Sequence, residues 1–148
     1  MAAEHVRTQI RKAITAALTG LTTAGDRVFE SYPHPLQDKD LPGLKVDTVD
    51  PGEVESDDLH DLLRRRLPVR ITACVKQNAG YQDVVDQMFL EVEKALAADQ
   101  TLGGLIHSLR PVSEPGYETE AGERTVQRAG QIFEVEYFTA FSAPDVAL

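Results

Sequence analysis

The chain has 148 residues, with 15 basic and 24 acidic side chains and a formal net charge of −9. A hydrophobic content of 42% is enough for one domain to bury a core and is too high for an intrinsically disordered chain. The negative field repels phosphate, so we expect no direct sequence-specific binding of nucleic acid. No stretch approaches the roughly 20 apolar residues that cross a membrane, and the N-terminus lacks the apolar core of a signal peptide. We therefore expect no membrane partner.

The first half of the chain predicts one helix followed by short strands. Apolar residues recur at steps of three and four over residues 4–21, which indicates an amphipathic helix. Strands are predicted at 27–32 and 41–49, with a polar, proline-containing loop between them. The acidic segment 53–61 is predicted to be an exposed excursion, with one or two helical turns that begin at Ser56.

The second half contains the clearest strand and a second helix. Residues 66–76 alternate between a wholly apolar face and a mostly polar or small face, which is typical of a sheet covered on one side. A helix is predicted over 81–98, a strand over 105–112 and a polar loop over 113–122. The last strand covers 132–141.

These elements predict one α+β domain over residues 1–148. The order α-β-β-β-α-β-β gives a mostly antiparallel sheet of four to five strands, with two main helices packed on one face. Residues 124–129 either extend the last strand or form a separate arm. Residues 142–148 are predicted to be a flexible C-terminal tail.

Two of these strands carry opposite charges. If the strand at 66–76 pairs with the last strand, Arg70 and Lys76 are expected opposite Glu134 and Glu136. Such cross-strand pairs contribute about 0.2–1 kcal/mol each.

The acidic segment also holds the densest group of potential metal ligands, Asp57, Asp58, His60 and Asp61. On a helix, Asp57 and Asp61 share one face, and a divalent ion would bind there through oxygens and an imidazole. The alternative, which we favour, is an acidic helix start stabilised by the helix dipole. We therefore expect no metal, and keep Asp57 and Asp61 as weak candidates.

The remaining residues do not indicate catalysis. Cys74, the single cysteine, lies in mid-strand, where a small buried side chain is the usual role, and it excludes an intrachain disulfide. Gly103 and Gly104 follow a helix and precede no lysine, unlike a phosphate-binding loop. No nucleophile triad is indicated by the spacing of the histidines at 5, 34, 60 and 107. We expect no catalytic residue and no cofactor.

A run of three arginines, Arg64, Arg65 and Arg66, contrasts with the acidic chain. It is either a solvated entry to the strand or an interface, because arginine pairs well with carboxylates of a partner. The interface candidates are Arg64, Arg65, Arg66, Asp57, Asp58, Glu134 and Glu136.

Several phrases along the chain together resemble a known family. They are the opening helix Val6-x3-Ile10-x3-Ile14 with the strand Arg27-Val-Phe, the segment Leu41-Pro-Gly-Leu-Lys-Val46, the basic strand 66–76 with its following helix, the phrase Asp99-Gln-Thr-Leu-Gly-Gly-Leu105, and the aromatic strand 133–141. In this order they resemble the tail terminator proteins of long-tailed bacteriophages, a group that includes minor tail protein U and other tail completion proteins.

The resemblance implies an α+β subunit that assembles into a hexameric ring. That ring would cap the tail tube, end its polymerisation and present a surface to the head. The implied partners are further copies of the chain, the major tail tube protein and a head-completion or connector protein. The implied location is the head-proximal end of the virion tail, after assembly in the host cytoplasm. Loops 33–40, 53–61 and 113–122 are the docking candidates.

Two alternatives remain open. The chain could be another neck or tail-completion protein, such as a head–tail stopper. It could also be a small cytoplasmic enzyme or ligand-binding protein that uses the acidic segment around a metal, which would give it a concave pocket and ion-dependent stability.

Overall fold

The computed structural model describes residues 3–49, 51–57, 61–76, 78–119 and 126–148. These residues form two α-helices, a short 3₁₀ helix and a seven-stranded sheet. In chain order the elements are α1 (Val6–Leu18), β1 (Val28–Glu30), η1 (Asp38–Asp40), β2 (Gly43–Thr48), β3 (Glu53–Asp57), β4 (Leu62–Lys76), α2 (Tyr81–Ala97), β5 (Ser108–Pro111), β6 (Gly116–Thr119) and β7 (Val126–Ala140).

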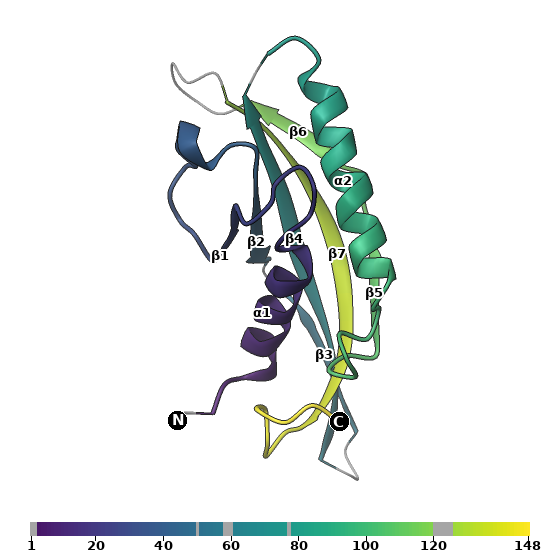
Figure 1. Ribbon diagram of the computed structural model, residues 1–148. Coiled ribbons are helices and arrows are strands. Elements are labelled where there is room, and N and C mark those ends of the chain that lie inside the picture. Colours follow the sequence, from purple (N-terminus) through teal and green to yellow (C-terminus); the bar gives the residue numbers. More distant parts are fainter. Residues whose placement is uncertain (1–2, 50, 58–60, 77, 120–125) are drawn as a thin grey trace.

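The sheet is built on one long antiparallel pair, β4 with β7. Each strand has 15 residues, and they pair from Leu62 opposite Ala140 to Lys76 opposite Val126. Short strands line both outer edges of this pair: β2 and β3 lie along β4, and β5 and β6 lie along β7. The parallel strand β1 extends the sheet beyond β2. Figure 1 shows the long pair running the height of the molecule.

Both helices pack against one face of this sheet (Figure 1). The apolar stripes of α1 and α2 are buried, and they share one core with the odd-numbered residues of β4 and β7. Helix α1 contacts β1, β2 and α2, and α2 contacts β4. The α+β class, with two helices on one face of a mostly antiparallel sheet, is therefore confirmed. The buried helix residues are Val6, Ile10, Ile14 and Leu18 of α1, and Val85, Met88, Phe89, Val92 and Leu96 of α2.

The opposite face, called the open face here, carries the even-numbered residues of β4 and β7. The loop after β1 covers one end of this face, where Leu36 packs with Cys74 and Val126 in a small second cluster. Cys74 is buried, as predicted. The loop 33–40, a docking candidate, is thus anchored to the sheet by Leu36.

The acidic segment differs from its prediction. Residues 53–57 form β3 and residues 62–63 begin β4, so the predicted helical turns over 56–63 are wrong in the described part of that segment. The physical reason is the partner strand: Glu53 lies opposite Arg66 and Glu55 lies opposite Arg64. Opposite charges at paired positions stabilise a sheet, and this pairing is invisible to a local pattern. The predicted polar loop 113–122 likewise contains a strand, β6.

The last strand, β7, begins before residue 132, so residues 126–129 extend it rather than form a separate arm. Residues 126–129 belong to β7, because β4 offers a partner along its whole length. β4 pairs with β7, as expected, but the predicted pairs of Arg70 and Lys76 with Glu134 and Glu136 are wrong. Arg70 lies opposite Ile132 and Lys76 opposite Val126, whereas Glu136 lies opposite Arg66. Alternation assigns each residue to a face, but it leaves the register free to slide by steps of two.

The segment after β7 returns along α1. The Val6 backbone N–H donates to the Pro144 carbonyl at 2.9 Å, and Gln9 Nε2 donates to the Asp145 carbonyl at 2.9 Å. The Leu148 N–H donates to the Phe138 carbonyl at 3.0 Å. These bonds join the C-terminal segment to the start of α1, and its flexibility stays a prediction.

Gly52 provides a test of the β3–β4 contact. A Cβ at this position would lie 2.7 Å from the Arg66 carbonyl oxygen, a backbone atom that moves only with its strand. We expect Gly52→Ala to lower the free energy of unfolding by about 1–3 kcal/mol, as overpacking does. Urea unfolding measures this change.

The matched control is Gly116→Ala in β6, where an added Cβ meets nothing within 4 Å. We expect it to leave the free energy of unfolding within about 0.5 kcal/mol of the parent. Equal losses in both variants would show that the approach of Gly52 to β4 is not the cause.

Candidate functional site

The arginine run is divided between the two faces of the sheet. Successive side chains of a strand point to opposite faces, so Arg64 and Arg66 lie on the open face while Arg65 lies on the helix-covered face. The three arginines, which the sequence predicted as one group, therefore have separate surroundings and separate chemistry.

On the open face, Glu136 of β7 joins the two arginines. Arg64 Nη2 lies 2.6 Å from Glu136 Oε2, and Arg66 Nε lies 3.6 Å from the same oxygen. The outer strand adds Glu55, at 3.5 Å from Arg64 Nη1, and Glu53, at 3.3 Å from Arg66 Nη1. We call these five residues the open-face network.

The centre and the rim of this network differ in exposure. The Glu136 side chain is 14% exposed, whereas Glu53 and Glu55 are 72% and 62% exposed. The hydrogen bond from Arg64 lowers the pKa of Glu136, and its positive charge and that of Arg66 add to this effect against the opposing effect of burial. Exposed ion pairs contribute little, so the stabilising contact is the one with Glu136 at the centre.

The open-face network lies within one subunit and holds β3, β4 and β7 together. Glu134, on the same face, is exposed and has no ion pair within the described residues. For all of these residues, a role at an interface between subunits stays a prediction.

The predicted metal-binding group is only partly described. Asp57 lies in β3, and Asp58 and His60 fall outside the described residues. Asp61 Oδ2 accepts hydrogen bonds from the Ser142 hydroxyl at 2.6 Å and from its backbone N–H at 3.3 Å. Within the described part of the chain, no group of three or more potential metal ligands comes together.

A cleft of about 360 Å³ lies on the helix side, between α1 and the beginning of β3 and β4. Four arginines line it, Arg7 and Arg11 of α1 and Arg65 and Arg66 of β4, together with one carboxylate, Glu53 of β3, and Tyr137 of β7. We call it the arginine cleft. The sequence reasoning missed it, although two signals were present: Arg7 and Arg11 are one helical turn apart, and Arg65 interrupts an otherwise apolar row of β4.

Positive charge dominates the arginine cleft. Arg11 is paired with Glu30 at 3.3 Å, but neither Arg7 nor Arg65 has a carboxylate partner among the described residues. Arg65 Nε instead donates to the Thr139 hydroxyl at 3.0 Å.

The neighbouring titratable groups respond to these charges. Burial lowers the pKa of His5, and the charges of Arg7 and Arg65 lower it further. Burial raises the pKa of Tyr137, and the same two arginines oppose that rise. Both guanidinium groups therefore act on the same small region of the protein.

Comparisons with known proteins assign no family. No family model matches the chain, and no curated protein matches it. One chain of a solved structure, the virion of a native gene transfer agent (GTA) particle, is 18% identical, with a TM-score of 0.39 over 89% of this chain and 90% of that chain. At this identity and TM-score the likeness assigns no function. Among the described residues, no helix is long and apolar enough to cross a membrane.

Glu136→Gln tests the centre of the open-face network. We expect this variant to be less stable than the parent at pH 7, because Arg64 and Arg66 lose the charge that neutralises them. The folded-state pKa of Glu136 lies below its ordinary value of 4.5. Its stabilisation is therefore complete above pH 4.5 and is lost as the pH falls through the lower folded value.

The measurement is urea unfolding of parent and variant between pH 7 and pH 3. The difference between them should shrink below pH 4.5. Glu134→Gln, on the same strand and face, is the control and should change stability little at any pH. A deficit for Glu136→Gln that stays constant down to pH 3 would show that charge is not its cause.

Proposed function

We propose that this protein is a structural component of bacteriophage tail assembly that forms a ring, of six copies by the implied family pattern, on the end of the tail tube. The proposal has two supports: the ordered sequence phrases that resemble tail terminator proteins, and an exposed apolar surface at one end of the sheet. In this function the protein acts by association alone and catalyses no reaction.

The observation that carries the proposal is the set of exposed apolar residues at the end of the sheet where β3 and β7 end and β4 begins. Phe141, directly after β7, is 73% exposed, Leu148 is 67% exposed and Val54 of β3 is 58% exposed. Figure 1 places β3 and the C-terminus at the same lower end of the molecule. Exposed apolar groups gathered in one region are typical of a surface that contacts another protein.

The fold offers the different surfaces that such a ring requires. A closed ring of identical subunits joins two unlike patches of each subunit, and a capping ring must also contact the tube on one side and a head protein on the other. The open face, the two outer edges of the sheet and the apolar end are distinct surfaces. An edge strand such as β3 carries acidic side chains, which oppose uncontrolled strand addition.

Assembly of the purified chain tests the proposal. We expect a species of about six times the 16.3 kDa subunit mass in native mass spectrometry as the protein concentration rises, and a ring in negative-stain images. A ring that forms only when isolated tail tubes are added also supports the proposal.

The other outcomes discriminate between functions. A protein that stays monomeric and does not bind tail tubes would contradict the proposal. Binding to an isolated head connector, but not to the tube, would instead indicate a head–tail stopper. A dimer at every concentration whose stability depends on Mg²⁺ would indicate a metal-dependent protein.

Phe141→Ser tests the apolar surface itself. We expect it to weaken assembly at least fivefold, because loss of a large apolar contact at an interface costs about 1 kcal/mol or more. Val112→Ser is the control, since Val112 is 56% exposed and its N–H donates to the Ile132 carbonyl, eight residues before the end of β7. Native mass spectrometry over a concentration series compares them, and equal weakening by both changes would contradict a specific role for the apolar end.

A further inference from the structure

Two of the four arginines at the arginine cleft have no carboxylate partner in the described part of the subunit. Glu53 pairs with Arg66 and Glu30 pairs with Arg11, which leaves Arg7 and Arg65. Arg7 and Arg65 come from elements far apart in the sequence, α1 and β4, and both act on His5 and on Tyr137. Two like charges at one cleft repel each other, although solvent screens part of the repulsion because Arg7 is exposed. An anion bound between them would remove this cost.

The surroundings favour an anion with a planar pair of oxygens. Guanidinium groups pair with carboxylates through two parallel hydrogen bonds, and Arg65 already has its Nε held by Thr139. Val54, which is 58% exposed, lines the same cleft and gives it an apolar rim. A carboxylate on a protein side chain therefore suits both the charge and the rim of the cleft.

We propose that the arginine cleft binds a carboxylate group, and that a neighbouring copy of this chain supplies it in the ring. The inference rests on the proposed function for the source of the carboxylate, but not for the site itself.

The charge of the chain supports a second copy as the source. Its net charge is −9, so the surface outside the cleft is rich in acids. The helix α2, for example, exposes Asp83, Asp86 and Glu93. The cleft is basic and the exposed side of α2 is acidic, so one subunit carries two unlike patches of opposite charge. This is the arrangement by which head-to-tail contacts join the subunits of a ring.

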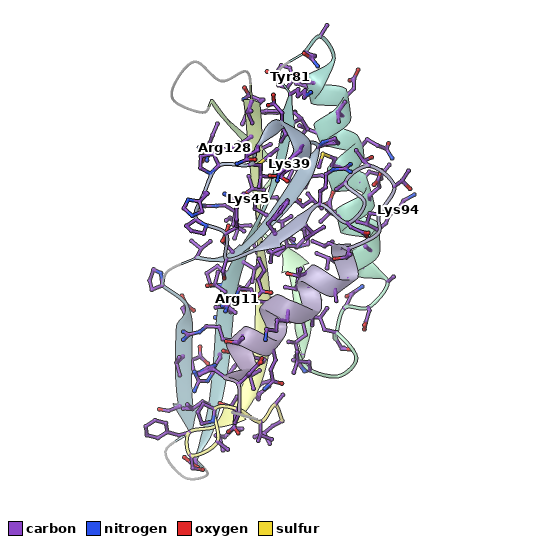
Figure 2. The ribbon with its side chains drawn as sticks, turned by 60° about the vertical axis from the view of Figure 1, so that its left-hand side comes forward. Arg11, Lys39, Lys45, Tyr81, Lys94 and Arg128 are labelled. Carbon is purple, nitrogen blue, oxygen red and sulfur yellow. The ribbon has the colours of Figure 1, made fainter. Side chains whose placement is uncertain are left out.

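Reversal of one charge tests the proposal in the full chain. Arg7 is exposed and its side chain has no bond partner in the described residues, so Arg7→Glu should leave the fold intact. We expect it to raise the protein concentration needed for assembly at least tenfold, and Arg7→Lys to have a smaller effect. Lys76→Glu is the control, because it makes the same change in net charge at an exposed position at the opposite end of β4 from the cleft. Figure 2 shows Tyr81, at the start of the helix that follows β4, well away from Arg11.

A second measurement separates the site from the ring. Citrate serves as a carboxylate probe, added at constant ionic strength and at a protein concentration below that of assembly. We expect citrate to raise the melting temperature of the parent and of Lys76→Glu, but not that of Arg7→Glu.

The outcomes distinguish this inference from the proposed function. If Arg7→Glu assembles like the parent and citrate stabilises both equally, the carboxylate site is refuted while the ring stands. If the parent forms no ring but citrate stabilises it through Arg7, the ring and the second copy as source are refuted while the carboxylate site stands. Loss of assembly in Lys76→Glu equal to that in Arg7→Glu would refute the specific contact.

Discussion

The pairing of β4 with β7 is the interaction on which the rest of the structure depends. It joins residues 62–76 to residues 126–140 and gives the shorter strands on either side an edge to pair with. Its helix-covered face supplies the apolar row against which α1 and α2 pack. Because the two strands are distant in sequence, closing this pair costs chain entropy before most of the core is buried. The apolar contacts along its full length offset that cost.

The same pair organises the charges. One residue step along β4 separates Arg64 and Arg66, which meet Glu136 on the open face, from Arg65, which faces α1. The two guanidinium groups on the open face form ion pairs with acids of their own subunit. Arg65 instead lines the arginine cleft together with Arg7 of α1. The run of three arginines therefore joins strands on the open face and creates an attractive site for an anion on the helix-covered face.

The apolar end and the arginine cleft are neighbours. Val54 belongs to both, since it is an exposed residue of β3 and a lining residue of the cleft. A partner that covers the apolar end would therefore reach the cleft as well. An apolar contact with charged groups at its rim is the usual anatomy of a protein interface, in which burial supplies affinity and charge supplies orientation. The proposed ring contact and the proposed carboxylate site thus describe one continuous region.

The sequence by itself determined the elements that have a strong local period. Both helices, the apolar face of β4 and the α+β class follow from side chains that repeat at 3.6 or 2 residues, because such a repeat specifies one buried face. The sequence also identified Glu136 and the three arginines at 64–66 as candidate interface residues. It did not determine β3 or β6, whose short, polar strands are stabilised by partners on β4 and β7 rather than by their own pattern.

Only the tertiary structure decided the register and the cleft. Alternation permits β4 and β7 to slide by two residues, so the partner of each charge depends on which register pairs the whole strands. The arginine cleft needs α1 to lie across the start of β4, which brings Arg7 to Arg65 over a separation of 58 positions in the sequence. A local pattern carries information about one element at a time, and a site shared by two elements exists only once they pack together.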